Sequence, residues 1–298
     1  MNSFRKLFFF AIAVTNLNFF PVYAFQSTDL VAEHSFTEGI EGPAVNRAGD
    51  LFAVNFKEQG TIGKVDQKGN GEVFITLPEG SIGNGIRFDK DQNMFVADYA
   101  GHKVYRLKNG SKTLEVWAED STMNQPNDLA ISDAGFIYLS DPNWSASTGN
   151  IWMVTPSREV RLLEANMGTT NGIEVSPNGK LLYVNESVQR KVWKYDILKD
   201  GTISNKRLFF SFEDYGMDGM RCDKKGNLYI ARYDKGTVVM ISRKGKLRKE
   251  ILLQGKKPSN IAFGGKDGRD GYVTMADRGC IEVIRIPHPG SYYSKVHK

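Results

Sequence analysis

The chain has 298 residues, of which 41% are hydrophobic and 24% are charged, a composition typical of a globular protein with a sizeable buried core. Its formal net charge of +5 falls to +3 without Arg5 and Lys6, and acidic residues are interspersed among the basic ones. A net charge this small gives no electrostatic reason to expect nucleic acid as a partner.

The first 24 residues differ in character from the rest of the chain. Arg5 and Lys6 precede the apolar run Leu7 to Val14, and Ala24 is a small residue suited to a cleavage site. The run is too short for a membrane span, and two asparagines follow it. Residues 1–24 are therefore predicted to be a secretory signal peptide. The mature protein would then be exported, periplasmic or secreted, without stable membrane insertion; an uncleaved membrane anchor is the alternative.

Six similar segments follow, each opening with an oxygen-bearing side chain and a short apolar run. Their first residues are spaced 43, 43, 44, 47 and 42 positions apart. Each segment is predicted to form four short strands, because apolar residues alternate between Gly, Asn and Asp turns. A repeat of this length indicates an all-β, six-bladed β-propeller with four-stranded antiparallel blades over residues 25–290. The leading residues are Glu41, Asn84, Asn127, Asn171, Asp218 and Asn260.

Only five of the six repeats contain a fourth strand of their own. The segment Asp29 to Phe36, before the first repeat, has strand character. If this N-terminal strand pairs as the outer strand of the last blade, the ring closes without an incomplete sheet. Residues 291–298 are expected to form a C-terminal tail without an assigned role.

The chain contains two cysteines, Cys222 and Cys280. Cys222 falls in the first strand of the fifth repeat and Cys280 in the third strand of the sixth. These strands lie at different radii of a propeller, beyond the reach of a disulfide. Two buried free thiols are predicted.

The six leading side chains are predicted to converge at one mouth of the channel, because first strands line the channel of a propeller. Two carboxylates and four carboxamides form a set of hard oxygen donors, which suits Ca²⁺, Mg²⁺ or another divalent cation rather than zinc. A glycine follows the leading residue in four repeats and would allow close packing there. These are Gly42, Gly85, Gly172 and Gly219. The alternative is that Asn and Asp only cap turns.

A second polar layer is predicted above this ring. Each second strand runs back toward the mouth, so the residue about 14 positions after the leading one returns to that face. This selects Asn55, Asp98, Asp141, Asn185 with Glu186, Arg232 and Asp277. The predicted substrate contacts come from both layers and are Asn84, Asn127, Asp141, Glu186, Arg232 and Asn260. Exposed strand ends without a role are the alternative.

Four motifs resemble the gluconolactonase/regucalcin-like family of six-bladed propellers, over about residues 36–286. They are Glu41-Gly-Pro, Pro126-Asn-Asp, the stretch 171–184 and the stretch 218–231. The resemblance implies a divalent ion held by Glu41, Asn171 and Asp218, with Asn127 on the metal or on bound substrate. It also implies that Asp218 doubles as general base. One departure is Gln125, where some members place an arginine tied to sugar-lactone recognition.

The predicted function is divalent-metal-dependent hydrolysis of a small-molecule lactone or ester, sugar lactones included. A cation would polarise the carbonyl group, and Asp218 would take the proton from water. Two alternatives stay open. One is an exported propeller that only binds a ligand or a protein partner; the other is a phosphotriesterase-like hydrolase with the same ring. No histidine falls in the ring, which disfavours a Ser-His nucleophile, and the sequence carries no signal for an oligomeric state.

Overall fold

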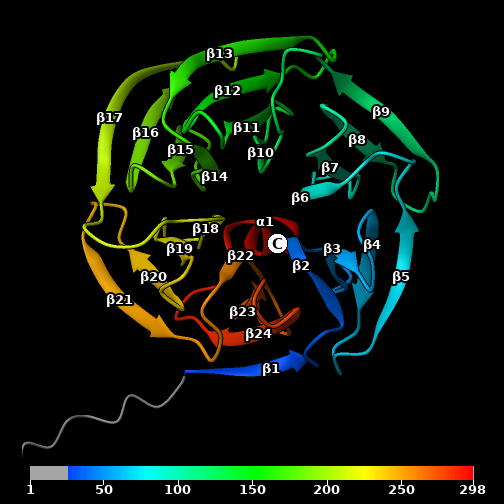
Figure 1. Ribbon diagram of the computed structural model, residues 1–298. Helices are drawn as coiled ribbons and strands as arrows, with labels where there is room; N and C mark the ends of the chain where they lie inside the picture. The colour runs from blue at the N-terminus through cyan, green and yellow to red at the C-terminus, as the bar shows by residue number, and fades with distance from the viewer. Residues whose placement is uncertain (1–25, 298) are drawn as a thin grey trace, which may run out of the picture.

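The computed structural model describes residues 26–297, so the predicted signal peptide lies outside the described residues. The described strands form six four-stranded antiparallel sheets, arranged as blades around a central axis (Figure 1). In the first five blades the chain runs from the innermost strand to the outermost. The predicted six-bladed propeller is confirmed.

The strand bounds follow the predicted repeats. Blade 1 contains β2 (Phe36–Val45), β3 (Leu51–Phe56), β4 (Thr61–Val65) and β5 (Gly71–Thr76). Blade 2 contains β6 (Gly83–Phe88), β7 (Met94–Asp98), β8 (Lys103–Leu107) and β9 (Leu114–Glu119). Blade 3 contains β10 (Leu129–Ile131), β11 (Ile137–Asn143), β12 (Thr148–Val154) and β13 (Val160–Met167).

The second half of the ring has the same organisation. Blade 4 contains β14 (Thr170–Val175), β15 (Leu181–Glu186), β16 (Lys191–Ile197) and β17 (Ile203–Ser211). Blade 5 contains β18 (Met220–Cys222), β19 (Leu228–Arg232), β20 (Thr237–Ile241) and β21 (Leu247–Leu252). Blade 6 contains β22 (Pro258–Gly264), β23 (Asp270–Met275), β24 (Cys280–Arg285) and β1 (Ser27–Val31).

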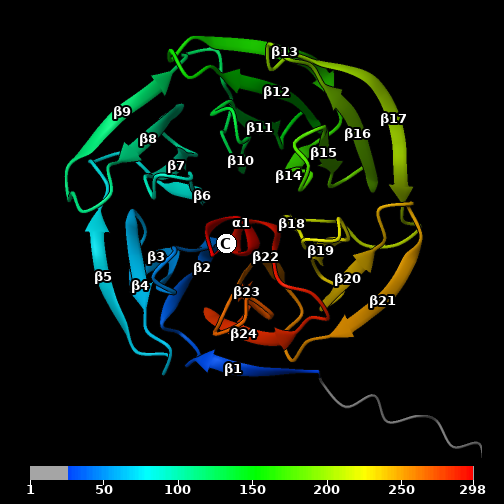
Figure 2. The same cartoon turned by 180° about the vertical axis from the view of Figure 1, so that it is seen from behind.

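The N-terminal strand closes the ring as predicted. β1 pairs antiparallel with β24, with Ser27 opposite Ile284, and Figures 1 and 2 show it along the outer edge of the last blade. β1 ends at Val31, earlier than the expected segment. The reason is a turn in which His34 has a φ of 61° and donates its main-chain N–H to the Arg278 carbonyl oxygen.

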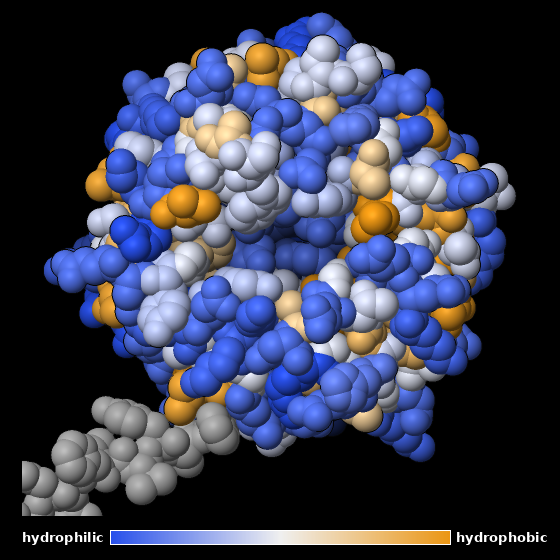
Figure 3. Space-filling view, in the orientation of Figure 1, coloured by the Kyte–Doolittle hydropathy of each residue, from blue (hydrophilic) through white to orange (hydrophobic). Residues whose placement is uncertain are grey.

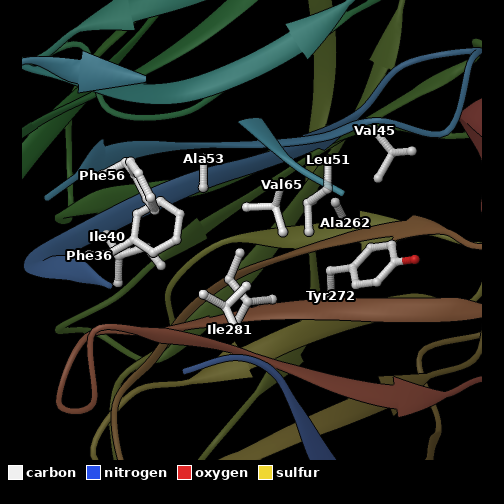
Figure 4. Packing of buried hydrophobic residues seen from close by; sticks show 11 residues of the cluster. Phe36, Ile40, Val45, Leu51, Ala53, Phe56, Val65, Ala262, Tyr272 and Ile281 are labelled. Carbon is white, nitrogen blue, oxygen red and sulfur yellow. The ribbon is translucent and has the colours of Figure 1, made fainter. Parts of the chain in front are cut away.

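Apolar packing between neighbouring blades forms the core. Buried residues fall into six clusters, and each joins two adjacent blades. Figure 4 shows the cluster between blades 1 and 6, where the rings of Phe36 and Phe56 meet edge to face with centroids 5.0 Å apart. Burying one such side chain contributes about 1.5–3 kcal/mol. The interface that joins the two ends of the chain is thus closed by apolar packing, as the other five are.

Both cysteines agree with the prediction. Cys222 in β18 and Cys280 in β24 are buried free thiols. Burial raises the pKa of each thiol, which keeps both protonated and unreactive at neutral pH.

The C-terminal segment has more structure than a simple tail. Helix α1 (Ser291–Val296) lies over the middle of the ring in both views (Figures 1 and 2). Lys295 forms an ion pair of 2.6 Å with Asp133, and the Tyr292 hydroxyl accepts a hydrogen bond of 2.7 Å from Gln92 Nε2. The helix bounds a cavity of about 300 Å³ at the carboxyl ends of the innermost strands. Within residues 26–297, no helix is long and apolar enough to cross a membrane.

Candidate functional site

The leading side chains lie at the other end of the innermost strands, where hydrogen bonds link several of them. Asn260 Nδ2 donates to Glu41 Oε2 at 2.8 Å, and Asn84 Nδ2 donates to the Asn127 carbonyl oxygen at 3.0 Å. The Asp218 carboxyl group contacts the side chains of both Asn171 and Glu41. The space-filling view shows a hollow lined by hydrophilic residues in the middle of the ring (Figure 3).

The glycines after the leading residues allow this close approach. A Cβ atom at Gly42 would lie 2.0 Å from the Asn84 carbonyl oxygen, and one at Gly172 would lie 2.5 Å from the Asp218 carbonyl oxygen. A Cβ atom at Gly219 would lie 1.9 Å from the Asn260 side chain. Real Cβ atoms do not approach other atoms so closely, so the predicted reason for these glycines is confirmed.

Three oxygen atoms of this ring are buried and accept no hydrogen bond: Glu41 Oε1, Asn127 Oδ1 and Asn171 Oδ1. A buried acceptor without a partner costs about 1–3 kcal/mol, so such atoms are rare without a functional reason. All three belong to residues predicted to bind metal. Coordination of a divalent cation would satisfy them, and carboxylate and amide oxygens are the donors that Ca²⁺ prefers.

Amide groups are essential to this donor set. Among residues 26–297, no three His, Cys, Asp or Glu side chains form a group suited to hold a metal ion. Glu41 and Asp218 supply the two carboxylates at the ring, and Asn127 and Asn171 supply neutral oxygens. These four residues are the ones that could hold a cation.

The two carboxyl groups of the ring destabilise each other's charge. Burial, followed by the charge of Asp128, raises the pKa of Glu41 to about 7. Burial, followed by the charge of Glu41, raises the pKa of Asp218 well above its usual range. Two adjacent carboxylates without a counterion are unfavourable, so the metal-free pair tends to hold a proton. A divalent cation would replace that proton.

A charged cluster lies beneath the ring and was not expected from the sequence. Asp128 is fully buried and forms an ion pair of 2.9 Å with Arg87 and one of 3.3 Å with Arg221. Glu174 Oε1 accepts a hydrogen bond of 3.3 Å from the Cys222 main-chain N–H, and burial raises the pKa of Glu174. Arg87, Arg221 and Glu174 also line the cavity under α1.

Irregular strand pairing explains why alternation missed Arg87 and Glu174 of this cluster. The pairing of β2, β6 and β14 shifts register next to Glu41, Asn84 and Asn171. A bulge at this point changes which later side chains face the channel. The signal in the sequence is a charged residue three positions after the leading one, in blades 2, 4 and 5.

The second polar layer anchors loops. In blades 2 to 6, the residue near the end of the second strand bonds to the loop that precedes the first strand of the same blade, and in blade 1 Asn55 bonds to Gly39 within β2 itself. The bonds are Asn55 Nδ2 to the Gly39 carbonyl (2.6 Å), Ile82 N–H to Asp98 (3.0 Å), Asn124 N–H to Asp141 (2.8 Å), Gly168 N–H to Glu186 (3.0 Å), Arg232 Nε to the Gly216 carbonyl (3.2 Å) and Lys256 N–H to Asp277 (2.6 Å).

These bonds bear on the predicted substrate contacts. Trp152 Nε1 also donates to Asp141, at 2.8 Å, and Arg232 Nη2 donates to the Asp214 carboxylate, also at 2.8 Å. Much of their hydrogen-bonding capacity is therefore used within the protein, and contact of Asp141, Glu186 and Arg232 with substrate stays a prediction. Asn185, one position before Glu186, instead supports the ring, because its Nδ2 donates to the Asp218 carbonyl oxygen at 2.7 Å.

The protein is thus a six-bladed propeller with oxygen donors at one mouth of its channel. It falls in the class of propellers that have a polar site on the ring axis. Residues 40–277 match the family described as the SMP-30/Gluconolactonase/LRE-like region. That match covers most of the chain, and the protein belongs to this family.

Individual relatives are distant. The chain is 26% identical over 208 residues to the gluconolactonase of Zymomonas mobilis, covering 61% of this chain and 58% of that protein. It is 28% identical over 258 residues to the diisopropyl-fluorophosphatase of Loligo vulgaris, covering 76% of this chain and 82% of that protein. The structure of a calcium-binding regucalcin from Agrobacterium tumefaciens superposes with a TM-score of 0.75 at 22% identity, covering 89% of this chain and 97% of that chain. This last likeness shows the fold alone.

Proposed function

We propose that the protein is a divalent-metal-dependent hydrolase that opens small lactones, with Ca²⁺ held by Glu41, Asn127, Asn171 and Asp218. The observation that carries the proposal is the set of three buried oxygens without hydrogen-bond donors at the ring. Membership of a family with gluconolactonases among its relatives supports the choice of reaction. Export of the mature protein stays a prediction from residues 1–24.

The cation would act as a Lewis acid on the lactone carbonyl oxygen, an effect on the order of several kcal/mol. Asp218 would accept a proton from the attacking water, whose oxygen forms a bond to the carbonyl carbon. The ring C–O bond then breaks, and the leaving oxygen takes the proton back from Asp218, which yields a hydroxy acid. The Asn171 side chain lies beside the Asp218 carboxyl group, opposes part of the rise in its pKa, and would orient it.

A bound cation would keep Asp218 in the ionised form that a general base requires. In the metal-free protein, burial beside Glu41 raises the pKa of Asp218, and the positive charge of the cation would oppose that rise. A base of this kind contributes roughly 10²–10⁴-fold to the rate. Asn185 would keep the main chain of Asp218 in place during the reaction.

The test is a panel of lactones, carboxylic esters and phosphotriesters, assayed after EDTA treatment and again after Ca²⁺ is restored. We expect lactone turnover to vanish with EDTA and to return with Ca²⁺. The variant Asp218→Asn should lose at least about 10²-fold in kcat, because it removes the base. Asp234→Asn is the matched control, since Asp234 is exposed at a φ of 64° that Asn also tolerates.

Different outcomes separate the candidate functions. Turnover of phosphotriesters but not of lactones would favour the second candidate, which the match to the Loligo enzyme supports. Bound Ca²⁺ without turnover of any substrate would favour a binding protein. Lactone turnover that survives both EDTA and Asp218→Asn would contradict the proposal.

A further inference from the structure

Asn260 is the one leading residue whose side chain is fully used inside the protein. It is fully buried on β22, and its Nδ2 donates to Glu41 Oε2 at 2.8 Å. Its Oδ1 accepts from Arg221 Nη1 at 3.1 Å and from the Ile261 main-chain N–H at 2.9 Å. The side chain therefore has little capacity left for a substrate.

The hydrogen bonds of Glu41 are divided unequally between its two oxygens. Oε2 accepts from Asn260 and from the Gly42 main-chain N–H, whereas the buried Oε1 accepts nothing. A carboxylate held by one oxygen has its orientation fixed and keeps the other oxygen free. The amide of Asn260 thus determines which oxygen of Glu41 is available at the ring.

The position of Asn260 is itself fixed from below. Arg221 Nη1 donates to the Met220 carbonyl at 2.8 Å and lies 3.3 Å from Asp128 Oδ2. Arg87 contacts the same Asp128 carboxylate through both terminal nitrogens, at 2.9 and 3.2 Å. Residues from blades 2, 3 and 5 therefore hold the amide.

We propose that Asn260 is a positioning residue for the metal ligand Glu41, and that Arg221 and Asp128 hold its amide in place. The proposal rests on the proposed metal site, and it replaces the predicted substrate contact of Asn260. Outer hydrogen bonds of this kind typically account for 10–100-fold in metal affinity. They act by fixing the orientation of the ligand.

The test compares metal binding by the wild type, Asn260→Ala and Asn55→Ala. Asn55 is a buried amide at the same mouth, but it bonds to the Gly39 carbonyl and the Gly60 N–H instead of to the ring. Calorimetry with Ca²⁺ gives the affinity. Luminescence lifetimes of bound Eu³⁺ in H₂O and D₂O give the number of coordinated waters, which reports directly on lost protein ligands.

We expect Asn260→Ala to weaken Ca²⁺ binding about 10–100-fold and to raise the number of coordinated waters. Asn55→Ala should leave both quantities unchanged, whatever its effect on stability. Asn260→Ser retains a hydroxyl donor at the same position and should be intermediate. It also serves if Asn260→Ala folds poorly.

Three results would overturn the proposal. A raised KM with unchanged Ca²⁺ affinity and hydration would mean that Asn260 contacts substrate. Equal changes in Asn260→Ala and Asn55→Ala would mean a purely structural role. Absence of Ca²⁺ and Eu³⁺ binding by the wild type would remove the metal site and this proposal together, whereas metal binding without turnover would contradict only the hydrolase.

Discussion

Gly219 lies at the most crowded point of the ring. A Cβ atom there would lie 1.9–2.3 Å from three atoms of the Asn260 carboxamide group. That amide cannot shift without losing its bonds to Glu41 and Arg221. A single methyl group at this residue should therefore disturb the ring directly.

We expect Gly219→Ala to lower the free energy of unfolding by about 1–3 kcal/mol, as overpacking of a buried site does. It should also weaken Ca²⁺ binding, because Asn260 and with it Glu41 must move. Chemical denaturation and calorimetry measure the two effects. Gly216→Ala is the control, since no atom lies closer than 3.2 Å to a Cβ there. Unchanged Ca²⁺ affinity in Gly219→Ala would show that the amide does not control the ligand.

The ring could be predicted at the level of single residues because its members recur at the same offset in each repeat. Asp128, Arg87 and Arg221 were missed for a physical reason. The register shift beside Asn84 changes which side of β6 Arg87 faces, and the periodicity of a regular strand does not encode such a bulge. Asp128 and Arg221 lie beside or in β10 and β18, which have three residues each, too few for alternation to show which side a residue faces. The remaining signal was the charged residue three positions after the leading one, which is Arg87 after Asn84 and Arg221 after Asp218.

At the scale of elements, the ends of the second strands determine the shape of the mouth. Their positions were predictable from hairpin geometry, but their partners are main-chain groups of loops, which sequence patterns do not reveal. Arg232 is the clearest case, with only 1% of its surface exposed. It donates to the carbonyl groups of Asp214 and Gly216, and its guanidinium lies 3.6 Å from the Phe212 ring centroid. The loop that it holds leads directly to Asp218.

Arg232→Met tests whether this side chain holds the loop or contacts substrate. Methionine keeps the apolar packing but leaves the loop carbonyls without donors, at a cost of about 1–3 kcal/mol in unfolding free energy. If Arg232 holds the loop, Ca²⁺ affinity and thermal stability should fall together. Lys235→Met is the control, because Lys235 pairs with the exposed Asp214 carboxylate without bonding the loop main chain. A higher KM with normal stability and Ca²⁺ affinity would instead assign Arg232 to the substrate.

At the scale of the whole molecule, closure of the ring brings residues from distant repeats around one channel. β1 completes blade 6, and Arg278 ties it there through ion pairs with Asp29 and Glu33. The count of fourth strands made this closure predictable. The position of α1 over the opposite end of the channel was not predictable, because a short polar segment has no periodicity that specifies where it docks.

Closure also buries Glu41 beside Asp218, and this should make stability depend on both pH and metal. In the metal-free protein the pKa of Glu41 is about 7, against an ordinary value of 4.5. Below pH 4.5 the Glu41 carboxyl group is protonated in both the folded and the unfolded protein, so it does not make the free energy of unfolding depend on pH. As the pH rises from there to about 7, the unfolded chain loses the proton first, so the metal-free protein loses stability, by roughly 3 kcal/mol for Glu41.

Bound Ca²⁺ should offset this loss, because it binds the ionised carboxylates. We expect the increase in Tm caused by excess Ca²⁺ to be small at about pH 5 and larger at about pH 8. A free Ca²⁺ concentration of about 100 times the Kd raises the free energy of unfolding by about 2.7 kcal/mol. Differential scanning calorimetry in EDTA and in Ca²⁺ at both pH values measures this. Glu41→Gln should reduce both the pH dependence in EDTA and the effect of Ca²⁺. An increase in Tm that is equal at both pH values would mean that Ca²⁺ binds away from this pair of carboxyl groups.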